Sequence, residues 1–105
     1  MEVGKGVMWR ERRPRLKDSF SIQEKAAYIT RESEIGVLLI DNNRGKIFEV
    51  NEVGSFIIKM CDGKNSIADI EDAICREYEV EREILEADVE KFFKRVEEYG
   101  IIEYD

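Results

Sequence analysis

The stretch that decides the fold lies near the middle of the chain and reads Gly45-Lys46-Ile47-Phe48-Glu49-Val50-Asn51-Glu52-Val53-Gly54. Its first half alternates with the period of two residues that is typical of a β-strand, and its second half starts the spacing typical of a helix. Phe48 and Val50 share one face of that strand, so we expect both to pack in the core. The stretch therefore predicts a boundary between a sheet that precedes it and helices that follow it.

Two further runs rich in β-branched and aromatic residues precede this stretch, at residues 27–30 and 36–41. Turn-forming residues separate the runs, and Asn43 or Gly45 can take a positive φ in the loop before residue 46. Consecutive strands with short connections favour an antiparallel meander. The last strand, residues 46–50, should then have one edge of unpaired backbone groups.

Two short helices are expected after the strands. Asn51 is a plausible N-cap for the first, which presents Val53, Phe56, Ile57 and Met60 at helical spacing and stops at Asp62-Gly63. Ser66 caps the second helix, with Asp69 in the capping-box position. Its apolar stripe consists of Ile67, Ile70, Ala73, Ile74 and Tyr78.

The longest helix is expected over residues 81–99 and ends at Gly100, after which Ile101-Ile102 should pack back on the body. Two neighbouring stripes run along it, one with Leu85, Asp88, Phe92, Arg95 and Tyr99, the other with Val89, Phe93 and Val96. One stripe should face the helices and the other the surface. The whole pattern predicts an α+β fold, in which a three-stranded antiparallel sheet is followed by a three-helix bundle, as in a winged-helix domain.

The first 22 residues lack periodicity and carry Gly4, Gly6, the sole proline, Pro14, and a cluster of basic residues. We predict a flexible N-terminal arm over residues 1–22, with Trp9 or Leu16 packed on a domain of residues 23–105. At 105 residues and 43% hydrophobic residues, the chain suits one compact domain. No segment has the length of a signal peptide or membrane span, so we expect a cytoplasmic protein.

The residue types of the chain argue against catalysis. Histidine is absent, and no Walker loop, GxGxxG turn or CxxC pair occurs. The carboxylates of Glu71-Asp72 and Glu97-Glu98 read as exposed helix faces, while Cys61 and Cys75 read as structural thiols rather than a disulfide. We therefore expect no catalytic, cofactor or metal site.

Two functions can be considered from these observations alone. A winged-helix domain usually binds DNA, but the helix from Ser66 to Tyr78 carries four acidic residues against Arg76 alone, and the net charge of the chain is −7. Phosphates would repel such a helix. The second possible function is that of a small accessory subunit of a larger enzyme.

A family resemblance is carried by the stretch from Gly45 to Gly54 together with Cys61-Asp62-Gly63-Lys64-Asn65-Ser66-Ile67, Ile70, Tyr78, Asp88-Val89 and Gly100-Ile101-Ile102. In this order and spacing the chain resembles the PqqD family over residues 37–102. Two features depart from the family pattern. The N-terminal arm is longer, and Val50 and Ile58 stand where many members carry Leu and Trp.

The resemblance implies a non-catalytic recognition element for ribosomally synthesised and post-translationally modified peptides. In the family, the leader segment of a precursor peptide docks as an extra strand in the groove between the third strand and the last helix. The domain then presents the peptide to a modifying enzyme, often a radical S-adenosylmethionine enzyme. The partners implied are thus a precursor peptide and that enzyme. The acidic charge and the lack of a span-length segment predict neither nucleic acid nor membrane as a partner, and the unpaired strand edge fits a monomer or a homodimer.

The residues expected to contact the peptide lie on these two elements. They are Lys46, Ile47, Phe48, Glu49 and Val50 of the strand, and Leu85, Asp88, Phe92 and Arg95 of the helix, with Val89 and Val96 at the base of the groove.

Overall fold

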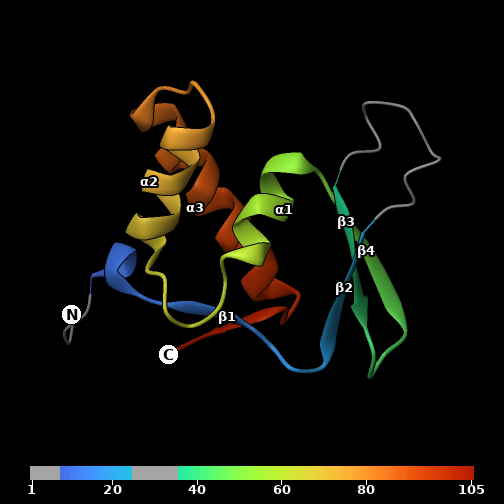
Figure 1. Ribbon diagram of the computed structural model, residues 1–105. Coiled ribbons are helices and arrows are strands. Elements are labelled where there is room, and N and C mark those ends of the chain that lie inside the picture. Colours follow the sequence, from blue (N-terminus) through green and yellow to red (C-terminus); the bar gives the residue numbers. More distant parts are fainter. Residues whose placement is uncertain (1–7, 25–35) are drawn as a thin grey trace.

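Two small antiparallel sheets and three helices make up the part of the chain that the computed structural model describes, residues 8–24 and 36–105 (Figure 1). The elements are the 3-10 turn η1 (Trp9–Glu11), β1 (Pro14–Leu16), β2 (Phe20–Glu24), β3 (Val37–Asp41), β4 (Lys46–Val50), α1 (Glu52–Lys59), α2 (Ile67–Glu77), α3 (Arg82–Glu98) and β5 (Ile102–Tyr104). The expected α+β fold, with a three-stranded antiparallel sheet and three helices, is confirmed.

The three-stranded sheet has the order β2-β3-β4, so β4 lies at an edge. Leu39 of β3 pairs with Phe48, and Val37 pairs with Val50. Val37, Leu39 and Val50 are buried and Phe48 is half-buried, which places one face of the sheet on the core. The core assignment of Val50 is confirmed, and Phe48 packs at the margin of the core.

The first strand of this sheet is β2, at Phe20–Glu24. The strand expected at residues 27–30 lies outside the described residues. β2 is hard to detect in the sequence because only Phe20 is buried and the next four residues are exposed. Its place in the sheet depends on pairing with β3 rather than on a pattern of its own.

A second, two-stranded sheet joins the two ends of the described chain. In it β1 pairs with β5, with Pro14 opposite Tyr104 and Leu16 opposite Ile102. Trp9 packs edge-on against Phe93 at 6.2 Å between ring centroids, which confirms the expected contact of the N-terminal segment with the body. The expected boundary between residues 22 and 23 falls inside β2, and the division into arm and domain stays a prediction.

The helix ends form as the sequence predicts. The side-chain oxygen of Asn51 accepts a 2.8 Å hydrogen bond from the Gly54 N–H, and Ser66 and Asp69 form a complete capping box. Gly100 adopts a φ of 71° and terminates α3. Ile101 and Ile102 are buried immediately after it, as expected.

The buried face of α1 differs from the expected one. Ile57 and Ile58 are buried, whereas Val53 is 38% exposed. Gly54 is also buried on the inner side. The inner face is thus centred one residue later than predicted, and one residue rotates a helix face by about 100°.

Glu71 corrects another expectation, because its side chain is fully buried rather than exposed. The Arg10 Nε lies 3.2 Å from Glu71 Oε1, and an Arg82 guanidinium nitrogen lies 3.6 Å from the same oxygen. Burial raises the pKa of Glu71, and the two guanidinium groups oppose that rise. Arg10 belongs to η1, far from Glu71 in the sequence. The spacing of residues within α2 therefore could not predict that Arg10 would shield Glu71 from solvent.

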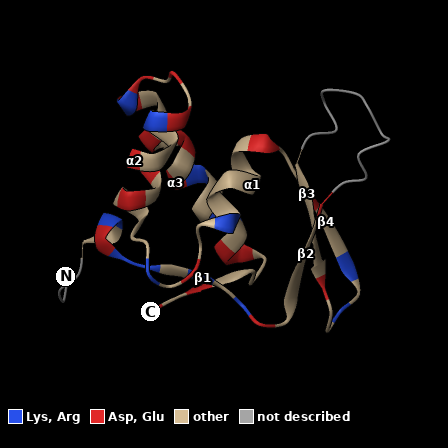
Figure 2. Cartoon of the chain, viewed as in Figure 1, with Lys and Arg blue, Asp and Glu red and all other residues tan. Residues whose placement is uncertain are grey.

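Two basic residues of the N-terminal segment, Arg12 and Arg15, contact residues near the C-terminus, where β1 and β5 lie side by side (Figure 2). Arg15 pairs with Glu103 and, at 3.6 Å, with Asp105. The Arg12 guanidinium lies 4.0 Å from the centre of the Tyr104 ring.

Within the described residues, no helix combines the length and the apolar character needed to cross a membrane.

The two cysteines are free thiols and should react at very different rates. Burial, assisted by the neighbouring Asp62 carboxylate, raises the pKa of Cys61 to about 12, whereas Cys75 is half-buried. At about pH 8 we expect a thiol reagent to modify Cys75 roughly a hundredfold faster than Cys61, because only the thiolate reacts. Cys75→Ala should remove the fast phase and Cys61→Ala should keep it. A fast phase that survives in Cys75→Ala would contradict the buried position of Cys61.

Candidate functional site

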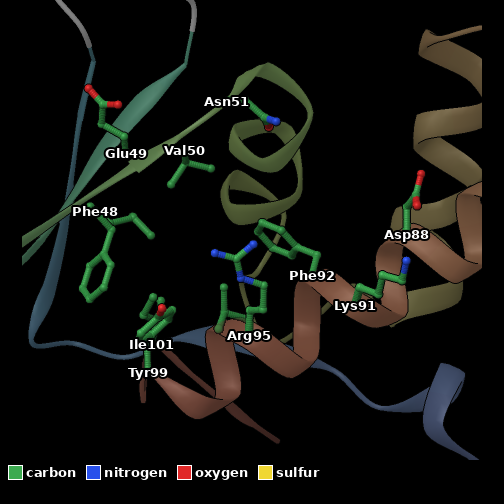
Figure 3. A pocket seen from close by; sticks show the side chains of 12 residues that line it. Phe48, Glu49, Val50, Asn51, Asp88, Lys91, Phe92, Arg95, Tyr99 and Ile101 are labelled. Atoms are coloured by element: carbon green, nitrogen blue, oxygen red, sulfur yellow. The ribbon is translucent and has the colours of Figure 1, made fainter.

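A groove of about 340 Å³ lies between β4 and α3 (Figure 3). Its walls come from the end of the sheet, the start of α1 and the outer face of α3. The lining residues are Leu39, Phe48, Glu49, Val50, Asn51, Asp88, Lys91, Phe92, Arg95, Val96, Tyr99 and Ile101.

Aromatic contacts hold the two long walls of the groove together. The rings of Phe48 and Tyr99 lie 5.0 Å apart between centroids, and Phe20 supports Phe48 from the other side at 6.5 Å. Phe92 packs edge-on against the buried Phe93 at 5.7 Å. Phe48 of β4 thus meets the C-terminal end of α3.

A close approach at Gly54 fixes the other end of the groove. A Cβ atom at this position would lie 2.6 Å from Val50 Cγ1 and 3.0 Å from Phe92 Cε1. The first turn of α1 therefore sits directly against both walls, and only glycine leaves the space for it.

The edge of β4 beside the groove has no strand partner within the described residues, where β4 pairs with β3 alone. On an antiparallel edge strand, alternate residues direct their N–H and C=O groups away from the sheet. Ile47 is 62% exposed on this strand. The groove thus combines an apolar floor with a row of backbone donors and acceptors.

Three charged side chains of α3 stand along the groove. Asp88, Lys91 and Arg95 are exposed, and none has an opposite charge within 4.0 Å among the described residues. Figure 3 shows the Arg95 guanidinium directed from α3 toward β4, with Lys91 and Asp88 further along the helix. Arg95 can therefore offer its fork of donors to a carboxylate or carbonyl in the groove.

Seven of the eleven residues predicted for the site line this groove, namely Phe48, Glu49, Val50, Asp88, Phe92, Arg95 and Val96. Lys46 and Ile47 lie on the same strand outside the lining. Leu85 and Val89 are buried and line a neighbouring cavity that also includes Asp88 and Phe92. A role of these residues in peptide contact stays a prediction.

Five lining residues were not predicted, and the sequence carries a signal for three of them. Lys91 stands three residues after Asp88 and four before Arg95, Tyr99 continues the same stripe, and Asn51 follows the strand directly. Leu39 and Ile101 reach the groove through strand pairing and the turn after α3, which no local pattern shows.

Polar side chains reach the groove from both of its walls. They are Glu49 of β4, Asn51 before α1, and Asp88, Lys91 and Arg95 of α3. Within residues 8–24 and 36–105 no group of three or more acidic, cysteine or histidine side chains gathers in a metal-binding arrangement. By its fold and its groove, the protein is a small α+β domain in which an open strand edge, unpaired within the described residues, lies beside a helix.

Comparison with known proteins identifies the family within this class. Residues 36–102 match the family described as Coenzyme PQQ synthesis protein D (PqqD). The chain belongs to the PqqD family. None of the curated proteins compared with the chain matches it.

Two solved structures are similar to most of this chain. "TbiB1 in Complex with the TbiA(beta) Leader Peptide" is 25% identical, with a TM-score of 0.70 over 85% of this chain and 94% of that one. "Lasso peptide synthetase B1 complexed with the leader peptide" is 24% identical, with a TM-score of 0.70 over 87% of this chain and 98% of that one.

Replacing Gly54 by alanine tests the packing at the end of the groove. Alanine in a helix normally stabilises by about 1 kcal/mol relative to glycine, but here its methyl group would overlap Val50 and Phe92. Overpacking costs about 1 to 3 kcal/mol, so we expect a net loss in the free energy of unfolding. Denaturant unfolding measures it, and NMR should show shifted Val50 methyl signals. A stabilised Gly54→Ala variant with unchanged signals would contradict the close approach.

Proposed function

We propose that this protein is a non-catalytic binding module that captures the leader segment of a ribosomally made precursor peptide by strand addition to β4. It then delivers the peptide to a modifying enzyme, a radical S-adenosylmethionine enzyme. The observation that carries the proposal is the open edge of β4 beside the groove formed with α3.

The edge supplies affinity that does not depend on the peptide sequence. An extended peptide laid along β4 would pair its own N–H and C=O groups with those that the strand directs outward, which is β-augmentation. β4 spans five residues, so a segment of similar length suffices to complete the pairing.

The groove floor supplies selectivity. Alternate side chains of the added strand would point toward α3 and meet Phe48, Phe92 and Tyr99. Tyr99 is 48% exposed, so contact with a peptide would bury apolar surface that is now open to solvent. Arg95 would favour a carboxylate near the middle of the peptide strand.

The similar structures support a peptide ligand, since both TbiB1 and lasso peptide synthetase B1 are described as complexes with leader peptides. The delivery step and the radical enzyme rest on the sequence resemblance. The cytoplasmic location is an expectation from the sequence alone, and the state as monomer or homodimer follows from the strand edge, which a second copy could also pair with. The winged-helix alternative gains nothing from α2, whose exposed Asp69, Asp72 and Glu77 would face phosphates.

Titration calorimetry with a synthetic leader peptide, encoded by a short reading frame beside this gene, tests the binding itself. We expect Arg95→Ala to weaken affinity about five- to thirtyfold, because a charge-assisted hydrogen bond contributes about 1 to 2 kcal/mol. Lys94→Ala is the matched control, since Lys94 lies on the same helix outside the groove lining. Equal affinities for the two variants would remove Arg95 from the site, and no binding of any neighbouring peptide would refute the function.

Strand addition has its own test in the peptide backbone. N-methylation removes one N–H donor, so methyl groups placed one residue at a time should weaken binding with a period of two residues. The amides that face β4 should be sensitive, and those that face solvent should tolerate the change. A uniform loss, or a period near three to four, would show that the peptide does not bind as an added strand.

A further inference from the structure

A second cavity, of about 410 Å³, continues the groove beyond the end of β4. Residues of α1, of α2 and the connection that follows it, and of α3 as far as Phe92 line it. Asn51, Asp88 and Phe92 line both cavities, so the two are contiguous. The proposed strand addition uses only the first of them.

This cavity has an exposed apolar rim. Val53 is 38% exposed, Val80 44% and Ile84 58%. All three line the same cavity, in a chain with 39% charged residues. Single exposed apolar residues are ordinary, but several around one hollow mark a place where a ligand or partner covers them.

We propose that the second cavity takes one large apolar side chain of the same precursor peptide, from a segment just outside the added strand. This inference rests on the proposed function and extends it. A cavity of this volume lies within the range of ligand pockets, so it accommodates a large aliphatic or aromatic side chain.

The path from the groove fixes which side of the peptide supplies the anchor. The cavity is lined by Asn51, Val53 and Gly54, which follow β4 in the chain, so it lies beyond the C-terminal end of that strand. Both existing pairs of this sheet are antiparallel, so we take the added strand to pair with β4 in the same way, which puts its N-terminal residues at this end. The anchor therefore precedes the strand-forming segment, and at about 3.3 Å per residue a few residues bridge the two.

The junction between the cavities carries polar groups suited to a crossing backbone. The Asn51 side-chain oxygen is engaged by the Gly54 N–H, whereas its amide nitrogen makes no hydrogen bond among the described residues. That amide can donate to a peptide carbonyl. Asp88, without a cation within 4.0 Å among the same residues, can accept from a peptide N–H or a basic side chain.

Continuity with the groove favours the peptide over other occupants. A peptide already held on β4 brings its next residues to the cavity at high effective concentration, so a single side chain suffices to fill it. A second copy of the chain or the modifying enzyme would have to cover the rim separately.

The test compares Ile84→Asn with Ala87→Asn. Both positions are exposed on α3, but only Ile84 lines the cavity. The probes are the synthetic leader peptide used above and a shortened form that lacks the residues preceding the strand segment. We expect Ile84→Asn to bind the full peptide about tenfold more weakly than wild type, and both proteins to bind the shortened peptide equally. Ala87→Asn should match wild type with both peptides.

Other results would overturn the inference. If Ile84→Asn binds the full peptide as wild type does while Arg95→Ala loses affinity, the groove binds the peptide and the second cavity does not. If wild type binds neither peptide, the proposed function fails with it. Self-association in sedimentation that Ile84→Asn abolishes, with peptide affinity unchanged, would assign the cavity to a second copy.

Discussion

The packing of β4 against α3 is the constraint on which the rest of the structure depends. Phe48 meets Tyr99 at one end, and Val50, Gly54 and Phe92 meet at the other. These contacts use only the side chains on the inner face of β4 and leave its backbone edge unpaired within the described residues. The strand is thus held firmly by its side chains while its hydrogen-bonding groups stay available, which suits a site that receives another strand.

The charges of the groove differ from those of the chain around it. Residues 47–105 carry 7 basic and 17 acidic residues, a net charge of −10, whereas the groove lining is balanced, with Lys91 and Arg95 against Glu49 and Asp88. Long-range attraction would favour a basic partner, whereas at short range Lys91 and Arg95 favour carboxylates and Glu49 and Asp88 favour basic groups. Recognition under the proposed function therefore depends on short contacts more than on steering, and it should change modestly with salt.

Much of this arrangement could be predicted because its signals are local. The stretch from Lys46 to Gly54 contains the alternation of the strand, the N-cap residue Asn51 and the closely packed Gly54. Ser66 and Asp69, three residues apart, form the capping box that predicts the start of α2. The helical spacing predicted that Asp88, Phe92 and Arg95 share one face of α3, and all three line the groove. Helical spacing alone could not show that Leu85 of this stripe lines the second cavity instead of the groove.

The features that could not be predicted all depend on distant residues. The β1–β5 ribbon pairs three residues from each end of the domain, and so short a strand has no period to detect. Glu71 is buried because Arg10, 61 residues away in the chain, covers it. β2 contributes one buried side chain and otherwise forms by pairing. In each case the partner, not the local sequence, determines the structure.

Hydrogen exchange of the backbone amides, measured with and without the leader peptide, tests the central claim most directly. Strand addition to β4 predicts slower exchange at alternate amides of Lys46–Val50 in the complex, because those N–H groups gain a partner. The edge of β2 serves as an internal control and should exchange at the same rate in both states. Protection at the β2 edge, or a bound peptide that leaves the β4 amides unchanged, would contradict the account.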